Sequence, residues 1–158
     1  MTQQQTHQVN PYALPATTHS YLARSAESLS EAVTAEVPRR YACAHVAALR
    51  AAAALLAARA RPAPARRRPQ KNAWVLLAEV APELSEWASF FAAGAAKRAA
   101  AEAGSSRAVT EREADDLVRD ADRVLGVVEQ ALGLVPHLPH PGRIAAPGGR
   151  WSGRAGVA

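Results

Sequence analysis

One pair of residues in this sequence has the types and spacing that suit catalysis, Arg40 and His45. A histidine can pass a proton to or from a ribose hydroxyl or a leaving oxygen, while an arginine holds the charged phosphate. The pair therefore indicates metal-independent cleavage of RNA, provided that both side chains reach one substrate. A helix turns by about 100° per residue, so five residues leave the two side chains about 140° apart. They converge only if Arg40 reaches round from a frayed helix start or a second subunit completes the site.

A structural role for His45 is the competing interpretation. The stretch between Pro38 and Pro62 is rich in Ala and Leu and predicts a helix from Pro38 to about Ala60. At helical spacing, His45 shares a face with apolar neighbours and points with them toward a core. That face holds Tyr41, His45, Ala48, Leu49, Ala52 and Leu56.

Three further helical regions flank this one. The first is expected from Thr17 or Thr18, either of which can cap it, to about Ala35, with an apolar stripe of Leu22, Ala26, Leu29 and Val33. The next opens at Asn72, is kinked or broken at Pro82, and continues to about Gly104.

The last predicted helix has the clearest end signals. Thr110 and Glu113 form a capping box, and Gly133 is placed to stop the helix. These regions predict an all-α protein, an antiparallel bundle of four or five helices over residues 17–134. Residues 1–16 are expected to be a disordered lead-in, and residues 135–158, rich in Pro, Gly and Arg, a disordered tail.

Positive charge is concentrated before residue 72. Residues 1–71 hold ten Lys or Arg against three Glu, whereas residues 72–132 hold six against eleven acidic residues. Such a basic region can neutralise nucleic-acid phosphates, although a GC-rich genome, which supplies many Arg, Ala and Pro residues, is an equally good explanation. The predicted nucleic-acid-binding residues are Arg39, Arg50, Arg59, Arg61, Arg66, Arg67, Arg68 and Lys71.

Other chemistry finds little support in the sequence. Glu79, Glu83 and Glu86 share a helical side but have no histidine nearby, and His137 and His140 flank prolines in the tail, where a fixed metal site is hard to hold. We therefore expect no metal and no cofactor. A single cysteine, the polar N-terminus and the lack of an apolar stretch near the roughly 20 residues that cross a bilayer predict a cytoplasmic protein without membrane contact.

Three segments together resemble the actinobacterial branch of HEPN domains. They are RYACAHVAALRAAAALLAARARP at residues 40–62, AWVLLAEVAPELSEWASFFAAGAAKRAAAEAG at 73–104 and VTEREADDLVRDADRVLGVVEQALGL at 109–134. The resemblance implies a helical bundle that often pairs into a homodimer. Its ribonuclease members, toxins among them, have an Arg, four to six residues and a His. Arg40 and His45 fit that spacing, but Tyr41 stands where the family has a polar residue, and the pair lies earlier than usual.

We therefore expect a HEPN-like binding module without catalysis of its own, which contacts RNA, a nucleotide or a protein partner and forms a homodimer. A nucleotidyltransferase, as in toxin and antitoxin pairs, is one such partner. The alternative is a metal-independent endoribonuclease of toxin or defence type that uses Arg40 and His45.

Overall fold

The computed structural model describes residues 13–59 and 71–140, and within them every regular element is helical. The helices are α1 (Ala16–Thr34), α2 (Val37–Arg59), α3 (Ala73–Val80), α4 (Ser85–Ala93), α5 (Ala95–Glu102) and α6 (Glu111–Ala131), with a 3₁₀ turn at Pro82–Leu84. The predicted all-α class is confirmed. The expectations for residues 1–12, 60–70 and 141–158 lie outside the described residues.

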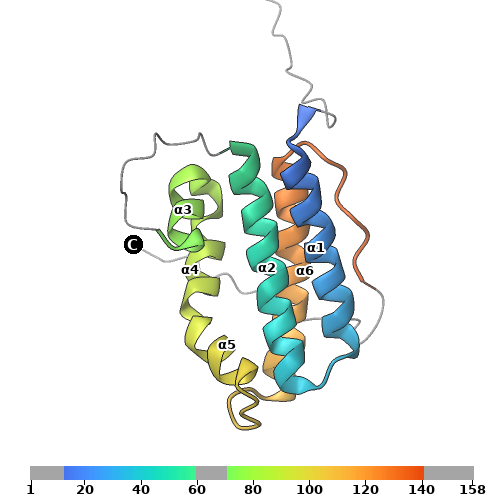
Figure 1. The fold of residues 1–158 in the computed structure, drawn as a ribbon, viewed down its shortest axis with the longest axis vertical. Coiled ribbons are helices and arrows are strands. Elements are labelled where there is room, and N and C mark those ends of the chain that lie inside the picture. The colour runs from blue at the N-terminus through green and yellow to red at the C-terminus, as the bar shows by residue number, and fades with distance from the viewer. Residues whose placement is uncertain (1–12, 60–70, 141–158) are drawn as a thin grey trace, which may run out of the picture.

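The helices form an antiparallel bundle with α2 at its centre (Figure 1). Helices α1 and α6 lie along one side of α2, and the broken run from α3 to α5 lies along the other. Successive long helices run in opposite directions, as short connections between neighbours require. The fourth member of the bundle is thus α3, α4 and α5 taken in sequence.

Helix α2 is buried on several sides at once. Its alanines at positions 44, 47, 48, 51, 52 and 54 are at most 1% exposed, and Leu55 is fully buried. The predicted core face was too narrow and slightly rotated, because Leu49 and Leu56 are only half-buried. By length and composition alone, α2 could also cross a bilayer. The prediction that no apolar stretch approaches the roughly 20 residues needed for a membrane span is therefore wrong. Here α2 packs against α1, α3, α5 and α6.

Buried hydroxyl groups join α1 to α2. The Thr18 hydroxyl donates a hydrogen bond of 3.1 Å to the Ala54 carbonyl, and the Ser25 hydroxyl donates one of 2.7 Å to the Ala47 carbonyl. The prediction that Thr17 or Thr18 caps α1 is wrong, since α1 already begins at Ala16 and its N-cap residue, Pro15, makes no side-chain bond. Small residues on both helices permit this close approach.

The run from α3 to α5 is interrupted at two points. Asn72 caps α3 as expected, accepting from the Trp74 backbone N–H, and Pro82 ends that helix. Gly94 separates α4 from α5, a break that the apolar stripe did not predict. A Cβ at Gly94 would lie 3.1 Å from the Tyr41 hydroxyl, so glycine lets α2 pass close to this junction.

Helix α6 begins and ends as the sequence predicted. Thr110 and Glu113 form both bonds of the capping box. At the other end Gly133 has a φ of 75°, and the N–H groups of Gly133 and Leu134 donate to the Gln130 and Glu129 carbonyls. This Schellman ending turns the chain back. Residues 132–140 then run beside α1 and α6 (Figure 1), and we call them the return segment.

Candidate functional site

His45 is enclosed in the aromatic part of the core. Its residue exposure is 1%, and its ring meets the rings of Trp74 and Phe91 edge-on at centroid distances of 6.0 and 5.6 Å. Its Nε2 atom lies 2.9 Å from the Phe91 carbonyl oxygen. A carbonyl can only accept, so Nε2 carries the proton and Nδ1 is the unprotonated nitrogen.

The surroundings of His45 favour its neutral form. Burial lowers the pKa of the ring below its usual value, although the bond to the Phe91 carbonyl opposes this shift. Nδ1 is buried and has no hydrogen-bond partner among the described residues. A general base must come within about 3 Å of the proton it removes, so a substrate would reach this ring only if the side chains around it moved.

Arg40 points to a different part of the bundle. Its side chain is 6% exposed and forms an ion pair of 2.6 Å with Asp115 at the start of α6. Its Nε–H donates to the Ala35 carbonyl at the end of α1, 3.2 Å away. The guanidinium therefore ties α2 to the ends of two neighbouring helices. The structure gives Arg40 and His45 separate partners and does not bring them together.

The predicted basic surface is only partly described, since Arg61, Arg66, Arg67 and Arg68 lie outside the described residues. Each described member has partners within the chain. Arg39 pairs with Glu31, and Lys71 with Glu79 at 2.8 Å.

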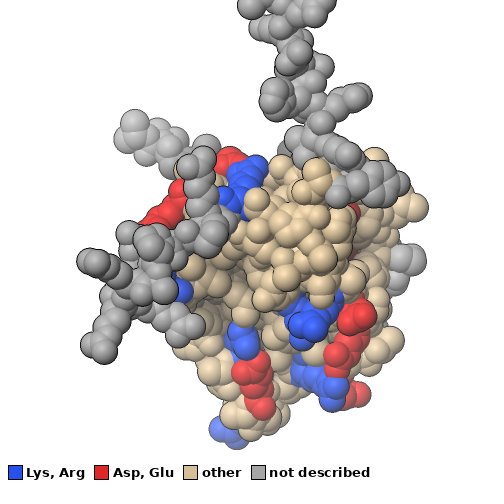
Figure 2. All heavy atoms as spheres, turned by 45° about the horizontal axis from the view of Figure 1, so that its top comes forward, with Lys and Arg blue, Asp and Glu red and all other residues tan. Residues whose placement is uncertain are grey.

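Arg50 and Arg59 are bound to neighbouring elements as well. Arg59 pairs with Glu83 at 2.5 Å. Arg50 donates to the Ser28 hydroxyl and the Arg24 carbonyl. On the face drawn in Figure 2, Lys and Arg accordingly lie next to Asp and Glu, and large areas carry no charge. The described members of the predicted set thus lie against acidic or polar groups of this chain.

A pocket of about 430 Å³ lies between the start of α2 and the end of α5. Glu36, Arg39 and Glu102 line it together with Pro38, Ala42, Ala101 and Gly104. Two carboxylates beside one arginine, itself paired with Glu31, make a poor cradle for phosphate.

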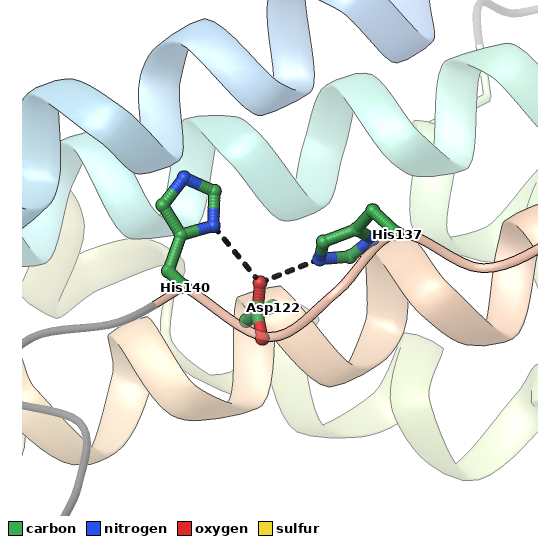
Figure 3. Close-up of side chains that lie close together, drawn as sticks. All are labelled: Asp122, His137 and His140. Carbon is green, nitrogen blue, oxygen red and sulfur yellow. Dashed lines mark hydrogen bonds and ion pairs between the residues drawn. The ribbon is translucent and has the colours of Figure 1, made fainter.

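A cluster of polar side chains forms where the return segment lies against α6. His137 Nε2 lies 2.7 Å from Asp122 Oδ1, and His140 Nδ1 lies 3.4 Å from the same oxygen (Figure 3). The sequence interpretation set these histidines aside because the tail was expected to be disordered from residue 135. That reason fails for residues 135–140, which the structure places against α1 and α6. The Gly133 turn was the available signal, since it directs the chain back along α6.

The described helices define the chain as an all-α antiparallel helical bundle. The chain belongs to the SAV_6107-like HEPN family, whose model matches residues 31–129. No curated protein and no solved structure matches it. The family match confirms the resemblance to HEPN domains that the sequence indicated. The matched range begins near the end of α1 and ends within α6, so the return segment lies outside it.

Proposed function

We propose that this HEPN bundle is a binding module without catalysis of its own. One observation carries the proposal: the Arg and His with ribonuclease spacing have separate structural tasks. His45 is enclosed and bound to the Phe91 carbonyl, while Arg40 is paired with Asp115. A ribonuclease would need both groups at one phosphodiester.

A protein surface is the partner that the described residues favour. Val75 on α3 and Phe90 on α4 are large apolar side chains that are 50% and 44% exposed. Trp87 meets Phe90 edge-on with its ring centroid 6.3 Å away. Aromatic side chains of this kind are enriched at the centres of protein interfaces. A second copy of the chain is the first partner to test, because it requires no further component.

Among the residues that the structure describes, the charges favour RNA less as a partner. Counterion release drives nonspecific RNA binding and needs cations that are free to meet phosphates. Arg39, Arg59 and Lys71 each already meet a carboxylate. Exposed pairs of this type are worth less than about 1 kcal/mol and can be exchanged for phosphates, but their net charge is close to zero.

Light scattering after size exclusion tests the protein partner, with the full-length chain studied over a range of concentrations. Pairing through α4 is supported if Phe90→Ser converts a dimer to a monomer. Ala99→Ser, at an exposed position of α5, is the control and should leave the dimer intact. A chain that stays monomeric at every concentration excludes the second copy and directs the search to a different protein.

Labelled single-stranded RNA, added in the same buffers, tests both RNA binding and RNA cleavage. Binding that weakens steeply with salt would make RNA the partner instead. Cleavage of the RNA by the wild type and not by His45→Asn would overturn the non-catalytic proposal.

A further inference from the structure

The return segment brings two histidines onto one buried carboxylate. Asp122, on α6, has a side chain that is only 9% exposed, whereas the side chains of His137 and His140 are 24% and 25% exposed. One nitrogen of each histidine and one Asp122 oxygen lie within 4.8 Å of one another. Figure 3 shows both rings directed at Asp122 from the same stretch of backbone.

The other nitrogen of each ring also has a partner. His137 Nδ1 lies 2.5 Å from Glu129 Oε1, and the backbone N–H of His137 donates to the second oxygen of that carboxylate at 3.0 Å. His140 Nε2 lies 3.3 Å from the Ser30 hydroxyl on α1. Metal-binding histidines characteristically donate their second N–H to a carboxylate or another acceptor, which fixes the ring and its tautomer.

His137 faces a carboxylate on each side, so each of its ring nitrogens must carry a hydrogen or meet a metal ion. If Nδ1–H donates to Glu129, the lone pair of Nε2 points at Asp122 Oδ1, and two acceptors cannot stand 2.7 Å apart with nothing between them. Either a second proton or a metal ion must lie there. The nearby nitrogen of His140, directed at the same oxygen, gives a metal a third ligand.

The separation between Asp122 and His140 suits a small dication with imidazole ligands. Bonds of about 2.0–2.2 Å in tetrahedral geometry place neighbouring ligand atoms about 3.3–3.5 Å apart. The 3.4 Å between Asp122 Oδ1 and His140 Nδ1 already has this value, and the 2.7 Å to His137 Nε2 would have to widen by roughly 0.7 Å. Two imidazoles and one carboxylate favour Zn²⁺ and its transition-metal neighbours over Mg²⁺ or Ca²⁺.

We propose that Asp122, His137 and His140 bind a transition-metal dication, Zn²⁺ in the first instance, with Glu129 and Ser30 orienting the two rings. Three protein ligands leave a fourth position for water or an external ligand. The metal fastens the return segment to α1 and α6. This site is independent of the proposed partner surface, since α3 and α4 contribute nothing to it.

Metal titration of the chelator-treated full-length chain tests the site. We expect the wild type to bind one equivalent of Zn²⁺ at this site and to melt at a higher temperature when loaded, because the metal binds only the folded arrangement. His137→Gln and His140→Gln should each weaken binding by roughly tenfold or more, and Glu129→Gln by about tenfold. His19→Gln on α1 is the matched control and should bind like the wild type.

A measurement on the unaltered protein guards against variants that fail to fold. X-ray absorption of the Zn²⁺-loaded wild type should show a first shell of nitrogen and oxygen with the scattering pattern of two imidazoles. A shell of oxygens alone would overturn the proposal. Wild-type binding no tighter than that of folded His137→Gln and His140→Gln would overturn it too, and would leave a proton as the cation between His137 and Asp122.

Discussion

His45 and Phe91 are 46 residues apart in the chain, yet the His45 ring donates a hydrogen bond of 2.9 Å to the Phe91 carbonyl near the end of α4. The same carbonyl accepts the Gly94 N–H at 3.1 Å, where α4 gives way to α5. The histidine thus joins the central helix to the break in the neighbouring helical run.

Replacing His45 by leucine should destabilise the fold by about 1–2 kcal/mol, because a buried bond and the matched ring packing are lost. The Phe91 carbonyl keeps its bond from Gly94, which limits the cost. Urea unfolding at neutral pH measures the change. His19→Leu, on the exposed side of α1, should stay within about 0.5 kcal/mol of the wild type. Equal effects of the two substitutions would contradict a structural role for His45.

His45 should also make stability depend on pH. Burial lowers its pKa below 6.5 in the folded state, so the unfolded chain binds more protons as the pH falls below that value. Stability contributed by the neutral ring is therefore complete above pH 6.5 and is lost at lower pH. Arg98 strengthens the shift and Glu102 opposes it. The difference in unfolding free energy between wild type and His45→Leu should shrink from pH 7.5 to 5. A constant difference would show that the ring does not titrate differently on folding.

Arg39 and Arg40 are adjacent in sequence and provide a matched test of burial. Arg40→Met should cost about 2–3 kcal/mol, since it removes the bonds to Asp115 and the Ala35 carbonyl and leaves Asp115 without its closest cation. Arg39→Met should cost less than about 1 kcal/mol, because its pair with Glu31 is largely exposed. Thermal or urea unfolding of both variants measures the two losses of stability. Loss of stability in Arg39→Met as large as in Arg40→Met would refute this assignment.

The sequence predicted features that depend on neighbours in the chain. The capping box at Thr110, the Asn72 cap, the break at Pro82 and the Gly133 stop are local, and the structure has all four. Features that depend on tertiary packing were harder to predict. Thr18 and Ser25 turn into the core because α2 offers carbonyls there.

The candidate sites show the same difference between features set by local sequence and features set by tertiary contacts. The inward direction of His45 followed from helical periodicity, but its partner on α4 did not. His137 and His140 become a candidate site only through contacts with Asp122, Glu129 and Ser30, which lie 8 to 110 residues away. Composition alone predicted a disordered tail at that point.

The capping box should contribute measurably to α6. Thr110→Ala removes the acceptor for the Glu113 N–H, and we expect a cost of about 1 kcal/mol, with Thr110→Ser close to the wild type. Bonds from Lys97 and Thr110 hold the pKa of Glu113 at about 2, well below 4.5. The Glu113 contribution is thus present above pH 4.5 and is lost as the pH falls toward 2. Glu113→Gln should lose stability relative to the wild type at pH 7 and converge with it in acid.

Ser25 tests how closely α1 and α2 must pack. Ser25 is fully buried, and its hydroxyl donates to the Ala47 carbonyl at 2.7 Å. Ser25→Ala loses that bond but keeps the small volume, so it should cost about 1 kcal/mol. Ser25→Val adds a branched side chain between helices lined by fully buried alanines, and overpacking should raise the cost by a further 1–3 kcal/mol or so. Urea unfolding with circular dichroism measures both. Should Ser25→Val prove as stable as Ser25→Ala, the two helices have room to separate and the close contact is not required by the fold.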